Sequence, residues 1–275
     1  NKIIKEKKIL LLILSIFCFS YMNNSYSIQA IPWGISSFLP IILIYYLSTL
    51  NKNFLNKKNI IIILFFNILF FYINWSLLFV SLIFYVLVNI FYTSKKFFIS
   101  FLIYLIFTIP GFFIIIQKEV TSGRLDFLPL QINLSFFFNL FERLYYIFIY
   151  NFSPIFSDHN YYIYLIPLFV LLIFSFILCS LKITKKANII TSFCLMCIYS
   201  YILLNILGKF PFKASRHTIF LFPFFLILIS YIIDNLYVKL FRKKILDLSI
   251  YTFLSIQILI SIINYSKYIN QNKFL

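Results

Sequence analysis

The sequence predicts an all-α membrane protein, a polytopic bundle of about nine transmembrane helices that forms a single domain over residues 1–275. Two properties lead to this fold class. Hydrophobic residues make up 63% of the chain and charged residues only 11%, whereas an ordinary soluble domain is about 25% charged. The apolar residues also occur in runs long enough to cross a bilayer, and short lysine-rich segments separate many of these runs.

The apolar runs define the predicted spans in chain order. Lysines precede the first run, and a polar break that ends at Pro32 precedes the second. The third and fourth runs follow one another with almost no loop, and Pro110-Gly111 predicts a kink in the fifth. The spans are predicted at residues 9–22, 32–50, 59–74, 75–92, 97–117, 161–181, 187–207, 218–240 and 246–265.

The interval 118–160 is the longest with polar character. Within it, the apolar run 136–150 is interrupted by Asn139, Glu142 and Arg143, too early for a span of about 20 residues. An amphipathic helix that lies in the membrane interface fits this pattern. We therefore expect an interfacial helix in the loop 118–160.

The lysines and arginines predict which loops face the cytoplasm. With Asn1 inside, the inner loops hold 16 of the 24 Lys and Arg residues and the outer loops six, as the positive-inside rule requires. The loops 22–32, 118–160 and 208–217 then lie on the outer face. Short loops account for the net charge of +17, and no basic domain outside the membrane is left to bind nucleic acid.

The cysteines do not predict a metal or redox site. Cys194 and Cys197 form a CxxC pair inside an apolar run, with no second pair and no histidine nearby. A buried pair three residues apart on a helix explains this spacing. We expect no metal site and no cofactor.

The segment 208–223, GKFPFKASRHTIFLFP, gathers basic groups at the mouth of the eighth predicted span. It contains Lys209, Lys213, Arg216 and His217 on the face where positive charge is normally avoided. An anion-binding role explains this position, because lipid phosphates and pyrophosphates are the anions common at the outer surface. The alternative is a positive anchor at the lipid headgroups.

A second outer motif, YSIQAIPW at 26–33, leads into the second predicted span. Together with the segment 208–223 it resembles the polyprenyl-phosphate-dependent membrane glycosyltransferases of the GT-C fold, in particular the family 39-like group. Members typically read S-x-E-A-R-P-Y at the start of a middle span. Here Ser27, Ala30 and Pro32 match, whereas Gln29, Ile31 and Trp33 stand in place of Glu, Arg and Tyr.

The group often reads R-Y/H-x-x-x-x-x-P at the start of a late span, and Arg216, His217 and Pro223 match this pattern. The resemblance implies transfer of a sugar from a polyprenyl-phosphate donor to a lipid-linked glycan or another cell-envelope acceptor, at the outer face of a bacterial inner membrane. It implies that Arg216 binds the donor phosphate, with Lys213 or Lys209 in support. His217 is either a hydrogen-bond donor to the phosphate or a structural residue.

Five further residues are secondary substrate-binding candidates: Gln29, Trp33, Asp126, Asp158 and His159. A base that activates the acceptor hydroxyl is sought among Asp126, Glu142, Asp158 and His159, and for each the alternative is a solvated loop residue, Glu142 at the polar edge of the interfacial helix. The group's catalytic Asp lies in its first outer loop, which we expect to precede Asn1. We therefore expect the chain to be the C-terminal portion of such an enzyme, without its catalytic residue.

Two other functions remain open. A flippase or other transporter of lipid-linked glycans would place charged residues in mid-span facing a pathway, and the sequence has almost none there. An O-antigen-type polymerase would also use outer-loop arginines, so the sequence barely separates it from the transferase. In each case the expected partners are membrane lipids, a lipid-linked donor and a glycan acceptor.

Overall fold

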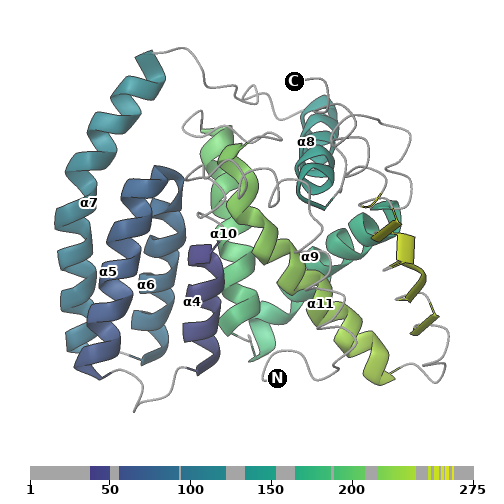
Figure 1. Ribbon diagram of the computed structural model, residues 1–275, viewed down its shortest axis with the longest axis horizontal. Helices are drawn as coiled ribbons and strands as arrows, with labels where there is room; N and C mark the ends of the chain where they lie inside the picture. The colour runs from purple at the N-terminus through teal and green to yellow at the C-terminus, as the bar shows by residue number, and fades with distance from the viewer. Residues whose placement is uncertain are drawn as a thin grey trace.

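The computed structural model describes residues 38–49, 56–92, 94–121, 134–152, 165–186, 189–207 and 216–239, together with parts of 247–262. Every secondary-structure element in these ranges is a helix, which confirms the all-α class. The predicted span 9–22 lies outside the described residues, and the predicted span 246–265 is described only in short helical pieces. The elements, labelled as in Figure 1, are α4 (Phe38–Thr49), α5 (Lys57–Ile73), η1 (Trp75–Leu77), α6 (Leu78–Tyr92), α7 (Lys95–Thr121), α8 (Leu134–Phe152), α9 (Ile166–Lys186), α10 (Ile189–Ile206), η3 (Arg216–Leu221) and α11 (Phe222–Lys239).

Several of these helices have the length and composition of membrane spans. Trp75–Tyr92, Lys95–Ile114 and Ile189–Ile206 are long and apolar enough to cross a bilayer, and they match the fourth, fifth and seventh predicted spans. The shorter apolar helices Phe38–Thr49, Ile166–Ser180 and Phe222–Ile233 lie within three other predicted spans. The structure is thus that of an apolar helical bundle compatible with an integral membrane protein, and the count of nine spans stays a prediction.

Asparagines stand at both ends of α5. Asn56 precedes the helix, and its side chain accepts a hydrogen bond from the backbone N–H of Asn59 at 2.9 Å. Asn74 is extended (φ −148°) and ends α5, while its Oδ1 accepts from the N–H of Ser76 at 3.1 Å and so begins η1. Such caps satisfy backbone donors that have no partner within a helix. A single residue therefore reverses the chain, in agreement with the expected short hairpin.

α7 passes through Pro110 without interruption and changes direction about midway along its length (Figure 1). Proline has no N–H to donate, and its ring crowds the preceding turn, which is the usual cause of such a bend. The carbonyl of Phe107 accepts a hydrogen bond from the Tyr72 hydroxyl of α5 at 2.8 Å. A Cβ on Gly111 would lie 3.2 Å from the Phe71 ring, so glycine permits the close approach of the two helices.

Described helix ends gather at two ends of the bundle (Figure 1). The start of α4, the α5–α6 turn, the end of α7, the end of α10 and the start of η3 lie at one end, which we call the η3 end. The end of α6, the start of α7, the end of α9 and the start of α10 lie at the opposite end. This arrangement has the alternation expected from the charge pattern: the ends that flank predicted outer loops lie together.

Within the bundle, α6 and α10 are central and α7 is peripheral. The spans that contain α6 and α10 are each 56% buried within the protein, against 22% for the span in α7. α6 packs against α10, α10 packs against α11 and α9, and α5 packs against α7 (Figure 1). The ends of these two central helices therefore form the middle of the η3 end.

Candidate functional site

Most of the predicted site residues lie outside the described part of the chain: Gln29, Trp33, Asp126, Asp158, His159, Lys209 and Lys213. Arg216 and His217 are the first two residues of η3, and their side chains are likewise outside the described part. The geometry of the candidate site therefore comes from the elements that carry or flank these residues at the η3 end.

η3 is a short 3₁₀ helix that leads directly into α11. The predicted span 218–240 thus begins as 3₁₀ helix and becomes α-helical only at Phe222, a difference that Pro223 explains. Proline fits the first turn of an α-helix, where N–H groups have no partner, whereas in a helix interior it removes a hydrogen bond and crowds the preceding turn. Thr218 and Phe220 of η3 are fully buried, which holds this short helix against the bundle.

Tyr201 of α10 is the main support beneath η3. Its ring lies 4.5 Å from that of Phe220, between centroids, and its hydroxyl donates a hydrogen bond to the backbone carbonyl of Ser76 in η1. Tyr201 and Ser76 are both fully buried. One side chain therefore connects α10, η1 and η3, three elements that are far apart in the sequence.

An aromatic layer of five rings extends this support across the bundle: Phe112, Trp75, Phe79, Tyr201 and Phe220. Phe112 of α7 lies 6.2 Å from Trp75 and 5.8 Å from Phe79, and Phe79 lies 6.1 Å from Tyr201. Ring pairs at these distances each add about 0.5–1.5 kcal/mol beyond the burial of their surface. The aromatic layer therefore connects α7, η1, α6, α10 and η3.

Further rings connect α8 to α11 and α9. Phe222 at the start of α11 lies 5.0 Å from Phe152 at the end of α8, and Phe152 stacks on Phe148 at 4.2 Å. Phe148 in turn lies 5.4 Å from Phe169 of α9. The C-terminal half of α8 is therefore packed against α9 and α11 beside the candidate site.

α8 is amphipathic, as expected for 136–150, and among the described helices it is not one that is apolar enough to cross a membrane. Its surface divides into a protein-facing side with Ile147, an exposed aromatic side with Phe141, and a polar side with exposed Asn139. Partial burial, and to a smaller extent its tyrosine neighbour, raises the pKa of Tyr145. Its orientation along the membrane surface stays a prediction.

The elements that follow the two sequence motifs are in contact. α4, which begins five residues after Trp33 in the sequence, packs against η3, which begins with Arg216. Both elements start at the η3 end (Figure 1). The structure thus brings together the two chain segments into which the motifs lead, although the motif side chains themselves are not described.

The buried polar groups of the described residues are all neutral. They are the side chains of Asn67, Asn74, Ser76, Ser81, Ser100, Thr108, Ser175, Thr191, Ser192, Asn205, Thr218 and Ser230. In the same residues, no group of three His, Cys, Asp or Glu side chains is placed to hold a metal ion. Cys194 and Cys197 are buried free cysteines, which agrees with their expected structural role.

The sequence had not singled out Tyr201, Ser76, Phe220 or Thr218. With 38 phenylalanines and 21 tyrosines in 275 residues, a single aromatic residue carries little information. The break at Asn74, which follows an apolar run and precedes a tryptophan, was the one signal that pointed to η1.

Comparison with protein-family models, with curated proteins and with solved structures finds no match to this chain.

Proposed function

We propose that this chain is part of a membrane glycosyltransferase with a GT-C-like bundle, and that the η3 end receives the phosphate of a polyprenyl-phosphate-linked sugar. The observation that carries the proposal is the placement of Arg216. It begins a short helix that is fixed by buried aromatic contacts, beside the start of α4, at an end of the bundle where predicted outer loops meet.

The chain segment that carries the basic residues is tied at both ends to this place. Gly208 follows Leu207 at the end of α10, and Ser215 precedes Arg216 at the start of η3. α10 and η3 are joined through Tyr201 and Phe220. We infer that Lys209 and Lys213 act near the mouth of this end together with Arg216.

In the proposed reaction, an acceptor hydroxyl attacks the anomeric carbon of the sugar. The new carbon–oxygen bond forms as the bond from the anomeric carbon to the phosphate oxygen breaks, and this oxygen keeps the electron pair. The hydroxyl proton passes to a base. Arg216 stabilises the charge that develops on the phosphate, because its planar guanidinium forms two parallel hydrogen bonds to two oxygens.

The remaining candidate residues have proposed roles in the same step. His217 donates a hydrogen bond to the phosphate, and Gln29 and Trp33 contact the donor from the segment that leads into α4. The base is sought in a preceding outer loop or among Asp126, Asp158 and His159.

The neutral interior favours an enzyme over a transporter. A transporter of a charged lipid-linked glycan needs ionisable groups along a pathway through the membrane. The buried polar side chains that the structure describes in the spans are those of Asn, Ser, Thr and Tyr, none of which carries a charge at neutral pH. Chemistry at the outer surface requires no such pathway, so we place the function at the η3 end.

The test compares Arg216→Lys with Arg216→Ala in the full-length protein. Membranes would receive polyprenyl-phosphate hexoses or pentoses labelled in the sugar, and transfer would be measured at matched protein abundance. We expect both variants to lose about 10²–10³ in turnover, since a lysine ammonium does not reproduce the bidentate contact.

Arg143→Lys and Arg143→Ala provide the matched control, because Arg143 lies on α8 outside the proposed site. These variants should retain turnover within a few-fold. A fully active Arg216→Lys enzyme would mean that Arg216 is only a positive anchor at the lipid headgroups. Movement of a lipid-linked glycan across the membrane without sugar transfer would show that the protein is a flippase and not a transferase.

A further inference from the structure

The end of the bundle opposite η3 carries a group of lysines. Lys57 and Lys58 begin α5, Lys95 and Lys96 begin α7, and all four are exposed. α5 and α7 run side by side in the same direction, so these lysines share one end of the bundle (Figure 1). The sequence contains no Asp or Glu from residue 7 to residue 118. Helices α4 to α6, and α7 as far as Lys118, thus supply no carboxylate to pair with these ammonium groups.

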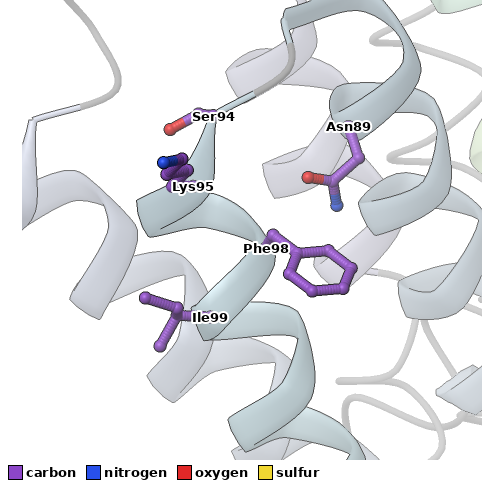
Figure 2. Close-up of a pocket in the computed structure, with 5 residues that line it drawn as sticks. All are labelled: Asn89, Ser94, Lys95, Phe98 and Ile99. Atoms are coloured by element: carbon purple, nitrogen blue, oxygen red, sulfur yellow. The ribbon is translucent and has the colours of Figure 1, made fainter.

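A cavity of about 490 Å³ lies beside one of these lysines, at the turn between α6 and α7. Asn89, Ser94, Lys95, Phe98 and Ile99 line it. Figure 2 shows Asn89 and Phe98 facing one another from neighbouring helices, with Ser94 and Lys95 together at the start of α7. The lining thus combines one cation and two hydrogen-bonding groups with an apolar floor.

The polar groups of the cavity retain hydrogen-bonding capacity. Asn89 donates one amide hydrogen to the Tyr85 carbonyl at 2.9 Å, and the second hydrogen of its NH₂ group is available. The Ser94 oxygen accepts from the N–H of Phe97 at 3.5 Å, which leaves the hydroxyl hydrogen to donate. With the ammonium of Lys95, the cavity offers donors suited to an anionic oxygen.

From the cavity, an exposed apolar stripe continues along one side of α7. It consists of Phe98, Leu102, Ile106, Ile109 and Phe113, which are between 41% and 70% exposed. These positions fall within less than a quarter turn of one another around an ideal helix, and they extend for about 22 Å along its axis. The stripe therefore runs from the lysines into the depth of the hydrocarbon core, which is about 30 Å thick.

We propose that the α6–α7 turn binds an anionic phospholipid, with its phosphate at Lys95 and an acyl chain along the stripe. Charge complementarity favours an anionic over a zwitterionic lipid, because the lysines face no carboxylate of their own helices. The apolar floor and stripe favour a lipid over a soluble phosphate. By the predicted topology this site faces the cytoplasmic leaflet, where basic side chains next to a span attract anionic lipids. It is separate from the donor site proposed at the η3 end.

The first experiment measures the affinity of the purified full chain for palmitoyl-oleoyl phosphatidylglycerol and for phosphatidylcholine with the same chains, by native mass spectrometry. Lys95→Gln is compared with Lys96→Gln, which removes the same charge from the adjacent exposed residue that does not line the cavity. We expect Lys95→Gln to weaken phosphatidylglycerol binding by about five-fold and to leave phosphatidylcholine unchanged. Lys96→Gln should change either affinity by less than about two-fold. Equal losses in both variants, or no preference for phosphatidylglycerol, would overturn the proposal in favour of diffuse attraction.

The second experiment locates the acyl chain. Ile109→Trp and Phe107→Trp introduce reporters at two positions of α7 that are 41% and 55% exposed, the first on the stripe and the second about 160° away around an ideal helix at nearly the same depth. Phosphatidylglycerol with brominated acyl chains should quench the Ile109→Trp reporter at a lower mole fraction than the Phe107→Trp reporter. Equal quenching of the two reporters would refute the binding of an acyl chain along the stripe. Displacement of the lipid by excess glycerol 3-phosphate would assign the cavity to a soluble anion instead.

Discussion

Replacing Tyr201 by phenylalanine tests whether the scaffold of the η3 end depends on a single hydroxyl. The change leaves the ring and its contacts with Phe79 and Phe220 in place and removes only the donor to the Ser76 carbonyl. Ser76 is fully buried, so its carbonyl would lose a partner away from water. Leaving a buried acceptor unsatisfied costs about 1–3 kcal/mol, and we expect the free energy of unfolding to fall by this amount.

Tyr199→Phe is the matched control, two residues away on the same helix. Tyr199 is 43% exposed, and its hydroxyl lies 2.7 Å from the Ser180 Oγ. Ser180 also donates to the Phe176 carbonyl, so it keeps a partner when the tyrosine hydroxyl is removed. We expect a change within about 0.5 kcal/mol.

The measurement is equilibrium unfolding in mixed micelles with increasing denaturing detergent. Tyr201→Ala sets the upper end of the scale, because removal of a buried aromatic ring costs about 3–5 kcal/mol. If Tyr201→Phe proves as neutral as Tyr199→Phe, the connection between α10 and η1 contributes nothing, and the argument that η3 rests on a fixed base fails.

Two predictions concern the arrangement in the membrane. A cysteine introduced by Ser122→Cys should react with an impermeant maleimide in intact cells, whereas one introduced by Thr184→Cys should react only after permeabilisation. Labelling at 184 in intact cells would overturn the topology. Nitroxide labels on α8 should show oxygen contact at Phe141 and water contact at Asn139, since the two residues lie on its aromatic and polar sides. A steady change of depth along α8 instead would mean that the helix crosses the bilayer.

The helices themselves could be predicted from the sequence because their signal is local. Apolar runs between lysines gave the positions of α5, α6 and α10 within two or three residues. The Asn74 break was also readable, since asparagine ends one helix and begins the next through its own side chain. The prediction placed the start of an α-helix at Thr218, but the structure has the 3₁₀ helix η3 there. The α-helix begins at Phe222 because Pro223 favours the first turn of a helix.

The support of the candidate site could not be predicted in the same way. Tyr201 and Ser76 are 125 residues apart, and their hydrogen bond depends on how α6 and α10 pack. Nothing local separates Tyr201 from Tyr199 in the sequence, yet one is fully buried and the other faces outward. The position of Arg216 at the mouth of a span was predicted from charge, and the packing of η3 against α4 emerged only from the fold.

The neutral interior and the charged ends of the bundle suggest two different roles for lipid phosphates, as part of a substrate at one end and as a bound lipid headgroup at the other. The buried polar side chains that the structure describes in the spans are neutral, and the described lysines of α5 and α7 lie where these helices begin. By the predicted topology, the basic residues that lead into α11 oppose the positive-inside trend, which supports the proposed anionic substrate over an anchor. At the opposite end the lysines follow that trend, which suits a lipid that stays in place. Arg216 variants should therefore change turnover without changing phosphatidylglycerol retention, whereas Lys95 variants should do the reverse.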